Sequence, residues 1–464
     1  MKDFDTIAAI ATPVGVGGIA VIRISGSDSV RAAEKIAFLK NGRQLSAAES
    51  HKLYLSDIKS VSEQSVIDEA LVAVMREPNS YTGETVVEIQ CHGGYLSANL
   101  ILEELFRAGV RQAEPGEFTR RAFMNGKTDL LRAEATIDLI HSNSEMGLSN
   151  AAKMLSGKLS EKVNALREKA VELAANLSAV ADFPDEIDEI PSDELSERIQ
   201  TISDEIDNML AGFKHGKIMR DGILTVIAGR PNVGKSSLLN ALSRTERAIV
   251  TDVPGTTRDT VEEYISINGI ALRLIDTAGI RESSDRVEQI GIEKARENIS
   301  AADLCLFVLD SSMPLSDEDM EIADRLRGIN TIVVVNKTDM SEHTDIAALS
   351  ERLGISAENF VMTAAPHGRE PVGIGALENK ISELFMSGNI SKDDVFISND
   401  RQKNSLIKAQ NIIKRMLSSL NAGLPSDLLF VDLEDVISAL GEITGVTVQD
   451  EIIDTVFDRF CVGK

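Results

Sequence analysis

A glycine-rich segment near the middle of the chain has the composition of a phosphate-binding loop. Residues 229–237 read GRPNVGKSS; the apolar run ILTVIA precedes them and the helical stretch LLNAL follows. In such a strand–loop–helix arrangement, backbone N–H groups and the helix N-terminus surround phosphate oxygens. We expect Lys235 to reach the outer two phosphates and Ser236 to bind Mg²⁺. The loop residues expected at the nucleotide are Asn232, Val233, Gly234, Lys235, Ser236 and Ser237.

Two further segments are expected to contact the triphosphate and its metal ion. The sequence DTAG directly follows the run LRLI, so a carboxylate would lie beside Mg²⁺ and a glycine N–H near the γ-phosphate. Residues 251–259 read TDVPGTTRD, and a threonine of this segment is the simplest source of a second magnesium ligand. The DTAG residues predicted at the nucleotide are Asp276, Thr277, Ala278 and Gly279.

A third group of residues is expected to recognise the base. Asn336, Lys337 and Asp339 follow the run TIVVV. The Asp339 carboxylate can accept two hydrogen bonds from guanine, whereas adenine offers no matching pair of donors and would leave the carboxylate unpaired. Thr363 and Ala364 follow the next apolar run and are expected to complete the pocket through backbone groups. The sequence therefore predicts a site for GTP rather than ATP.

The residue that orients the attacking water is not evident. Ras-like enzymes use a glutamine just after the segment that corresponds to DTAG. This chain has Ile280 there, which cannot hold a water molecule. Glu282, Asp285 and Glu288 follow and could take over, or an outside activator could be required. The residues alone leave these alternatives open.

The apolar runs around these motifs predict an α/β domain at about residues 216–384. ILTVIA, LRLI, LCLFVLD, TIVVV and FVMTA alternate with helical segments. Strands that are apolar along their whole length are typical of a mostly parallel sheet covered on both faces. The phosphate-binding, DTAG and base-recognition segments each follow one of these runs, so we expect them to meet at one edge of the sheet.

Helical segments flank this domain on both sides. Residues 123–215 contain few glycines, and Leu195, Ile199, Ile202, Ile206 and Leu210 form a stripe at helical spacing. Helix returns at about residues 385–464, so we expect the two blocks to form one helical domain into which the α/β domain is inserted. Residues 1–122 show alternating runs punctuated by glycine, which is typical of an α+β domain.

Length and charge limit the classes of function. The chain has 464 residues, enough for several domains, and 48 basic against 73 acidic side chains give a net charge of -25. This charge disfavours non-specific binding to nucleic acid or to an anionic membrane. Three separated cysteines fit neither a disulfide framework nor a zinc site. Without a signal pattern or an apolar span, we expect a cytoplasmic protein with no membrane partner.

Longer segments add to these motifs: DTIAAIATPVGVGGIAVIRISG, SYTGETVVEIQCHGG, PGEFTRRAFMNGK, DFPDE, IVTDVPGTTRD, DTAGIRE and the closing CVGK. Through them, nearly the whole chain resembles the MnmE (TrmE) family of tRNA-modification GTPases. The segment APHGREPVG at 365–373 departs from the usual family pattern after the last base-pocket strand.

The resemblance implies a multidomain fold with three parts. These are an N-terminal α+β folate-binding-like domain that forms a homodimer, a central helical bundle built from two chain segments, and an inserted Ras-like α/β P-loop GTPase domain. The N-terminal domain would bind 5,10-methylene- or 5-formyl-tetrahydrofolate. Basic groups suit the glutamate tail of this ligand, and a carboxylate suits the donors of its pterin ring. The residues implied by the matching motifs are Arg23, Glu88, Lys127 and Lys464.

The resemblance also implies how hydrolysis proceeds. A potassium ion would supply positive charge between the β- and γ-phosphates, where other GTPases use an arginine finger. Thr257 would be the second magnesium ligand, Glu288 would orient the water, and Lys235 and Glu288 would be the catalytic residues. The potassium ligands would be Asn232, Thr251, Thr256 and the carbonyl of Val253, with Thr251, Thr256 and Thr257 also lining the nucleotide site.

In the family, hydrolysis drives domain movement in a heterotetramer with the flavoprotein MnmG, which carries FAD. The complex builds a carboxymethylaminomethyl-type group at C5 of the wobble uridine of certain tRNAs. Cys461 would lie near the reacting carbon, and we expect a structural or ligand-lining thiol there rather than a nucleophile. The competing hypothesis is a GTP-dependent assembly switch that acts on ribosomal RNA or a membrane. Such a protein would be expected to carry a basic domain or an amphipathic anchor, and this acidic sequence shows neither. A folate-binding scaffold with a vestigial GTPase disagrees with the complete set of GTPase motifs.

Overall fold

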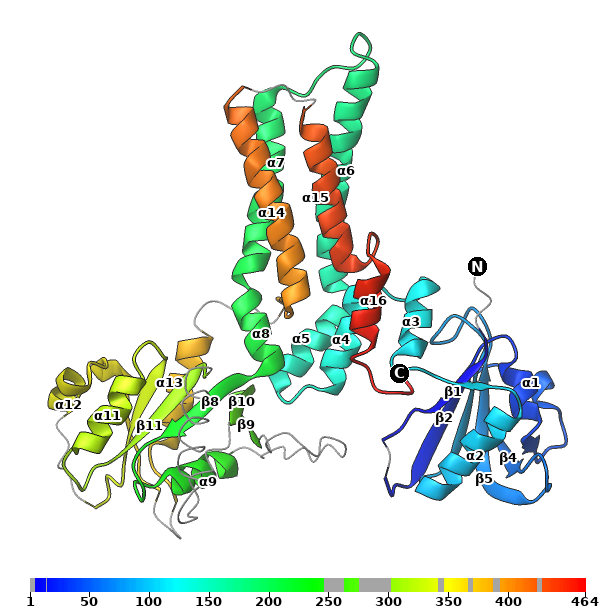
Figure 1. The fold of residues 1–464 in the computed structure, drawn as a ribbon, viewed down its shortest axis with the longest axis horizontal. Coiled ribbons are helices and arrows are strands. Elements are labelled where there is room, and N and C mark those ends of the chain that lie inside the picture. The colour runs from blue at the N-terminus through cyan, green and yellow to red at the C-terminus, as the bar shows by residue number, and fades with distance from the viewer. Residues whose placement is uncertain are drawn as a thin grey trace. The chain divides into compact units, whose positions relative to one another are not determined.

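The computed structural model describes residues 5–13, 15–245, 263–274, 302–340, 346–365, 370–386, 393–423 and 428–464. The chain forms two compact units, each assembled from segments that are distant in sequence (Figure 1). Unit 1 comprises Met1–Ile137, Leu155–Glu189 and Pro425–Lys464. Unit 2 comprises Asp138–Met154 and Ile190–Leu424. Among the described helices, none is both long and apolar enough to cross a membrane.

Unit 1 contains a seven-stranded sheet in the order β3-β4-β5-β6-β2-β1-β7. Neighbouring strands are antiparallel except β1 and β7, which are parallel. Helices α1 and α2 contribute to the apolar core on one face of the sheet. The bounds are β1 Ile7–Ile10, β2 Ile19–Ser25, α1 Ser29–Glu34, β3 Ala37–Leu39, β4 Leu53–Lys59, β5 Val66–Met75, β6 Val86–His92, α2 Tyr95–Arg107 and β7 Arg111–Gln112.

The sequence of β6 explains how this sheet presents polar groups. Successive side chains of a strand point to opposite faces. Ile89 and Cys91 are buried in the core beneath the helices. Glu88 and Gln90 therefore lie on the other, open face, and Glu88 is directly opposite Arg23 of β2 in the register. The open face thus carries two of the charged residues that the sequence singled out.

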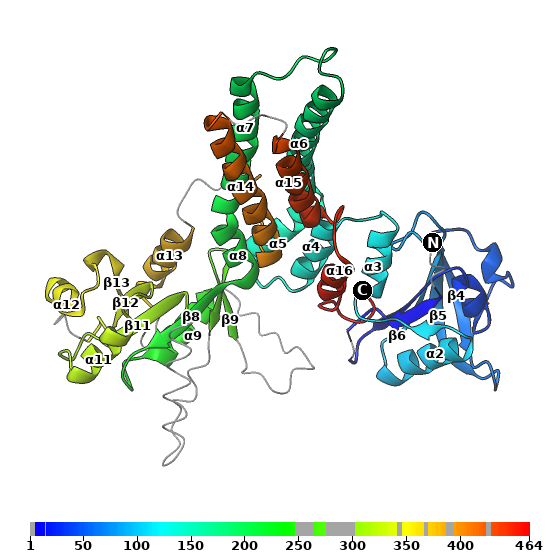
Figure 2. The same cartoon turned by 45° about the horizontal axis from the view of Figure 1, so that its top comes forward.

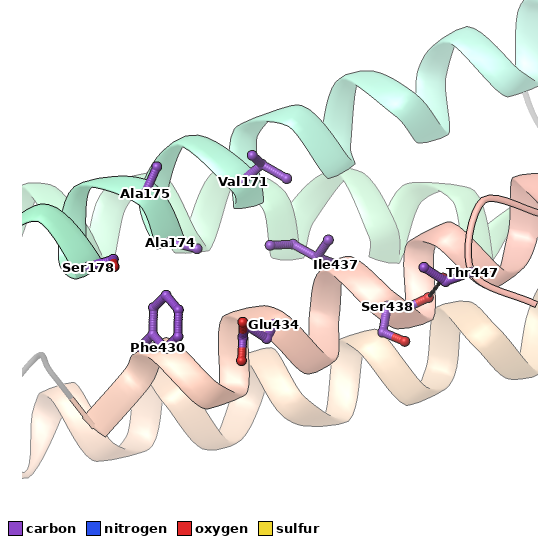
Figure 3. A pocket seen from close by; sticks show the side chains of 9 residues that line it. All are labelled: Val171, Ala174, Ala175, Ser178, Phe430, Glu434, Ile437, Ser438 and Thr447. Atoms are coloured by element: carbon purple, nitrogen blue, oxygen red, sulfur yellow. Dashed lines mark hydrogen bonds between the residues drawn. The ribbon is translucent and has the colours of Figure 1, made fainter.

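The rest of unit 1 is helical. The long helix α6 packs against α15, and a shallow groove of about 420 Å³ between them is lined by apolar and small side chains such as Val171, Ala174 and Phe430 (Figure 3). Helix α16 joins the start of α4 in a small apolar cluster that includes Leu130 and Phe457. The bounds are α3 Glu117–Met124, α4 Leu130–Ile140, α6 Lys158–Asp182, α15 Leu429–Thr444 and α16 Asp450–Phe457.

Unit 2 contains a six-stranded sheet in the order β13-β12-β11-β8-β10-β9 (Figure 2). All neighbouring pairs are parallel except β10 and β9, so the predicted mostly parallel sheet is confirmed. The bounds are β8 Ile223–Ala228, α9 Lys235–Thr245, β9 Glu263–Ile267, β10 Ile270–Leu274, β11 Leu304–Asp310, α11 Asp317–Arg325, β12 Thr331–Asn336, α12 Ile346–Leu353, β13 Phe360–Met362 and α13 Ile374–Phe385.

Strand β11 shows why its apolar run is continuous. Leu306 and Val308 belong to the core on the side of α9 and α13, whereas Phe307 and Leu309 belong to the core on the side of α11 and α12. Both faces of the strand are therefore buried, as parallel strands between two helical layers require. All four of these side chains are buried or nearly so.

The helices of unit 2 confirm the predicted amphipathic stripe. In α7 the stripe residues Leu195, Ile199, Ile202 and Ile206 are buried, whereas Leu210, in the last turn of the helix, is half-buried. Helix α7 packs against α14, and Gln410 Nε2 donates to Ser203 Oγ at 2.9 Å between them. The helix bounds are α5 Glu145–Leu155, α7 Ser192–Ala211, α8 Phe213–Asp221 and α14 Asp400–Asn421.

Candidate functional site

The glycine-rich segment forms a loop between the end of β8 and the start of α9, as predicted. The backbone is left-handed at Asn232, with φ of 64°, and at Gly234, with φ of 100°. A Cβ atom at Gly234 would overlap the side-chain amide of Asn336. Glycine is therefore required there both for the backbone conformation and for the close approach of the neighbouring segment.

The ammonium group of Lys235 lies inside this loop. Its Nζ donates to the carbonyl of Gly229 and, at 2.9 Å, to that of Arg230. Burial lowers the pKa of Lys235 below its ordinary value. The charge of Glu318 opposes this shift but does not outweigh it. In the part of the chain that the structure describes, this ammonium forms no salt bridge. A partly buried cation of this kind, at the N-terminus of a helix, fits an anionic ligand such as a triphosphate. Ser236, the next residue, is exposed and available to a metal ion.

Asn336 connects the base-recognition segment to the phosphate-binding loop. Its Nδ2 donates to the carbonyl of Val233 at 3.0 Å, and its Oδ1 accepts from Thr363 Oγ1 at 3.2 Å. Asn336 is 2% exposed, so both of its polar atoms need these internal partners. The structure therefore joins three of the predicted segments through one side chain.

Lys337 makes a second connection to the same loop. Its Nζ donates to the carbonyl of Asn232 at 2.7 Å and to Asp310 Oδ2 at 2.6 Å. Burial by itself raises the pKa of Asp310, but hydrogen bonds from Lys337 and Ser312 outweigh it and hold that pKa below its ordinary value. Asp310 was not among the predicted site residues. The available signal was a carboxylate that ends an apolar strand at the same edge of the sheet.

The remaining predicted base-pocket residues are close by. Asp339 is exposed in the turn after β12. The N–H of Thr363 donates to the carbonyl of Val335 at 2.8 Å, and the N–H of Ala364 donates to the carbonyl of Val372 at 3.0 Å. Thr363 thus holds the base-recognition segment at Asn336, through its hydroxyl, and at Thr338, through its carbonyl. A role for the backbone of Thr363 and Ala364 in binding guanine stays a prediction.

The structure thus brings together the phosphate-binding loop and the base-recognition segments. The other predicted nucleotide and metal residues lie outside the described residues. They are Thr251, Val253, Thr256, Thr257, Asp276, Thr277, Ala278, Gly279 and Glu288.

A second group of charged residues lies on the open face of the sheet in unit 1. Arg23 Nε donates to Glu88 Oε1 at 2.9 Å, and the two side chains are 16% and 19% exposed. The guanidinium carbon of Arg23 is 5.3 Å from the ring centre of Tyr81 and 5.7 Å from that of Phe118. These two aromatic residues were not predicted. Tyr81 does, however, belong to the SYTGE segment quoted for the family resemblance.

The chain's last residues reach the same face. Val462 pairs with Pro115 in an isolated bridge, and the carbonyl of Gly463 accepts from Arg23 Nη1 at 3.5 Å. Burial, followed by the charge of Arg23, lowers the pKa of Lys464, while Glu88 opposes this shift. Three of the four residues predicted for folate binding are therefore close together.

Lys127 and Cys461 lie somewhat apart from this group. Lys127 Nζ donates to the carbonyl of Pro78 at 3.0 Å, and among the described contacts none joins it to the other three residues. Pro78 lies two residues before the SYTGE segment that carries Tyr81. The thiol of Cys461 is exposed, whereas Cys305 is buried in the core of unit 2.

Comparisons with known proteins cover the whole chain. The family described as "GTP-binding protein TrmE N-terminus" matches residues 6–127, and the family described as "MnmE helical domain" matches residues 130–461. The tRNA modification GTPase MnmE of Geobacillus thermodenitrificans is 43% identical over 467 residues, covering 100% of both chains. That of Carboxydothermus hydrogenoformans is 43% identical over 463 residues, covering 99% of both.

Among solved structures, the G domain of the FeoB iron transporter of T. maritima is 31% identical. The match covers 34% of this chain and 96% of the FeoB G domain, with a TM-score of 0.26. The predicted fold class, with a TrmE-type N-terminal domain, an MnmE-type helical domain and an α/β sheet domain, is confirmed. GTP as ligand, Mg²⁺ bound with the nucleotide, and tRNA as the molecule modified follow from the family. The chain belongs to the MnmE (TrmE) family of tRNA modification GTPases and is a GTP hydrolase that acts in tRNA modification.

Proposed function

We propose that this enzyme is a potassium-activated GTPase that works with the flavoprotein MnmG in the cytoplasm. Together they install a carboxymethylaminomethyl-type group at C5 of the wobble uridine of certain tRNAs. The one-carbon unit would come from 5,10-methylene- or 5-formyl-tetrahydrofolate, and FAD would be carried by MnmG. In this proposal the chain forms a homodimer through residues 1–122, and two copies join MnmG in a heterotetramer.

The observation that carries the GTPase part is the ammonium of Lys235, which is partly buried within the phosphate-binding loop and forms no salt bridge with any described residue. Among the described residues its bonding partners are the carbonyls of Gly229 and Arg230, so a triphosphate would supply the missing negative charge. Ser236 and Thr257 would hold Mg²⁺, and Glu288 would orient the attacking water. The nucleotide would also contact Asp276 and its neighbours, and Asp339 would accept from guanine.

Potassium would be held by Asn232, Thr251, Thr256 and the carbonyl of Val253. This ion would add positive charge between the β- and γ-phosphates, where charge develops in phosphoryl transfer. Of the four residues, Asn232 lies in the described part of the chain. It is exposed and has a left-handed backbone, with φ of 64°, while Lys337 holds its carbonyl at 2.7 Å. This leaves the side chain of Asn232 available to an ion.

The charged group on the open sheet face supports the folate part of the proposal. Arg23 and Lys464 offer positive charge beside the Glu88 carboxylate. A ligand with both an acidic tail and an amide-and-amine ring edge can engage both signs of charge. Lys127 would bind the ligand from the segment after α3. The aromatic rings of Tyr81 and Phe118 limit the movement of the Arg23 guanidinium.

The same sheet face supports a homodimer. Leu53, Leu55 and Leu71 are 55%, 46% and 38% exposed. Leu55 is opposite Leu71 in the register, and Leu53 is opposite Ala73, which itself is opposite Glu88. An apolar patch of this kind marks a protein interface. A second copy placed over it would shield the apolar side chains and enclose the neighbouring charged group.

The proposal is tested by nucleoside analysis of tRNA from cells that lack this protein. We expect the modified wobble uridine to disappear and to return when the wild-type chain is supplied. Lys235→Ala and Arg23→Ala should each fail to restore it, because one removes phosphate binding and the other the proposed folate contact. Unchanged wobble uridine in the deletion strain would refute the proposed product. Restoration by Arg23→Ala would refute the folate site alone.

A further inference from the structure

A carboxylate that no GTPase motif includes lies beneath the base-recognition segment. Asp310 is the last residue of β11, and its side chain is 4% exposed. It accepts from Lys337 Nζ at 2.6 Å, and the same ammonium donates to the carbonyl of Asn232 at 2.7 Å. One ammonium group thus joins the end of a core strand, the base-recognition segment and the phosphate-binding loop.

The carboxylate of Asp310 is held in one orientation. Its Oδ1 accepts from the N–H of Ser312 at 2.9 Å and from Ser312 Oγ at 2.6 Å, which directs Oδ2 toward Lys337. The next residue, Ser311, donates its N–H to the carbonyl of Asn336 at 2.9 Å. The turn after β11 and the turn after β12 are therefore joined by both backbone and side-chain contacts.

The backbone of Lys337 needs such support. Its φ of 63° is in the left-handed region, which a non-glycine residue adopts at a cost in free energy. A conformation of this kind persists when the surrounding contacts hold it in place. Here the holding contacts are the two acceptors of Lys337 Nζ and the bond from Thr338 N–H to the carbonyl of Thr363 at 3.2 Å.

We propose that Asp310 is a positioning residue for guanine-nucleotide binding and acts through Lys337. It fixes Lys337 in the conformation that holds the base-recognition segment against the phosphate-binding loop before the nucleotide arrives. Binding then requires less ordering of the two segments, and the bound nucleotide leaves more slowly. This inference rests on the proposed guanine site at Asn336, Lys337 and Asp339.

The test is a double-mutant cycle read by the dissociation rate of a fluorescent guanosine diphosphate from the full-length protein. Asp310→Asn keeps the shape of the side chain but removes its charge, and we expect dissociation about tenfold faster. Lys337→Met should accelerate it at least as much. The double variant should be no faster than Lys337→Met alone, because the effect of Asp310 passes through Lys337.

Asp303→Asn is the matched control. Asp303 precedes the same strand at its other end, and its Oδ2 accepts from the N–H of Leu224 at 3.0 Å. The same chemical change there should alter thermal unfolding at most and leave nucleotide dissociation unchanged. A purely structural role of Asp310 would not make nucleotide dissociate faster from Asp310→Asn than from this control.

Two results would overturn the inference. One is a wild-type dissociation rate in a folded Asp310→Asn protein. The other is an equal acceleration of dissociation by Asp310→Asn in the wild-type and the Lys337→Met backgrounds. Should Asp310→Asn fail to fold, Ser312→Ala takes its place, because it removes a donor that orients the carboxylate. We expect about threefold faster dissociation that likewise vanishes in the Lys337→Met background. Failure of the wild-type protein to bind guanine nucleotide would instead refute the proposed site itself.

Discussion

The carbonyl of Gly463 accepts a hydrogen bond from Arg23 Nη1 at 3.5 Å, across 440 positions of the sequence. The contact joins the end of the chain to the second strand of the N-terminal sheet. Gly463 has φ of 99°, and a Cβ atom there would overlap the carbonyl of Ile10. Both the conformation and the space at this position therefore require glycine.

Gly463→Ala should weaken the binding of 5-formyl-tetrahydrofolate by about tenfold or more, because the tail must move away from Ile10 and carries Lys464 with it. Equilibrium titration of the full-length protein measures this. Thermal unfolding should change little, since the last two residues contribute little to the core. Unaltered folate affinity would exclude Lys464 from the site.

Gly423→Ala provides the matched control for this change. Gly423 also has a positive φ, of 73°, but no atom of the described residues lies within 4 Å of the position of an added Cβ. The substitution introduces the same kind of backbone strain without a steric overlap. It should leave folate affinity at the wild-type value.

The loop between β8 and α9 and the sheet around it could be predicted because their signals are local. The phosphate-binding loop at 229–237 is specified by glycine, lysine and the flanking apolar runs, all within about one strand and one helix. The parallel sheet followed from the continuous apolar runs, since a strand buried on both faces needs apolar residues at every position.

The contacts that depend on register could not be predicted in this way. Arg23 faces Glu88 because β2 and β6 pair in one register, and a shift by one residue would send the two side chains to opposite faces. Asp310 meets Lys337 because β11 and β12 lie side by side with Asp310 opposite Asn336. The local sequence places Asp310 at the end of an apolar strand, but in neither case does it say which residue is the partner. The position of Lys464 beside Arg23 and Glu88 depends both on this register and on the path of the last residues of the chain.

Potassium should raise the rate of GTP hydrolysis strongly relative to sodium at equal ionic strength. The physical reason is that the proposed ion adds positive charge between the β- and γ-phosphates in the transition state. Phosphate release at saturating GTP and Mg²⁺ measures the two rates. Asn232→Ala should reduce the difference between the salts, because Asn232 is a proposed ligand. Equal rates in both salts with the wild-type protein would eliminate the ion from the mechanism.

Glu288→Ala should lower the rate of hydrolysis by about 10²-fold or more while GTP still binds, as expected for the loss of a residue that positions the water. Single-turnover hydrolysis and nucleotide titration separate the two effects. Glu282→Ala is the control, because Glu282 is a nearby acid that the sequence left as an alternative. A larger loss with Glu282→Ala, or the loss of GTP binding with Glu288→Ala, would contradict the assignment.

Asp339→Asn should shift the preference of the site from guanosine to xanthosine nucleotides. The carboxylate accepts from the N–H groups of guanine, whereas an amide can donate to the carbonyl of xanthine at the same place. Competition between GTP and xanthosine triphosphate for the full-length protein measures the change. Retained preference for GTP would show that another residue recognises the base.

His92 and Asp68 form a pair on the N-terminal sheet. His92 Nδ1 lies 2.6 Å from Asp68 Oδ1, and the Asp68 carboxylate also accepts from Ser97 Oγ at 2.9 Å. The hydrogen bond and the charge of Asp68 raise the pKa of His92. An NMR titration should therefore give a His92 midpoint above the ordinary value of about 6.5. Asp68→Asn should return it toward that value, whereas Ser97→Ala should leave most of the shift.

The sign of the effect on stability follows from the same pKa. Because the folded-state pKa is the higher one, the stabilisation by the charged pair is fully present below the unfolded-state pKa of about 6.5 and is lost as pH rises through the folded value. His92→Gln should therefore reduce the free energy of unfolding more at pH 5.5 than at pH 9. At pH 5.5 the substitution removes a charged imidazolium that binds Asp68, whereas at pH 9 the imidazole that it replaces is already neutral. Chemical denaturation at the two pH values measures this difference. A loss that is equal at both would mean that His92 contributes through packing alone and that Asp68 does not bind it as a cation.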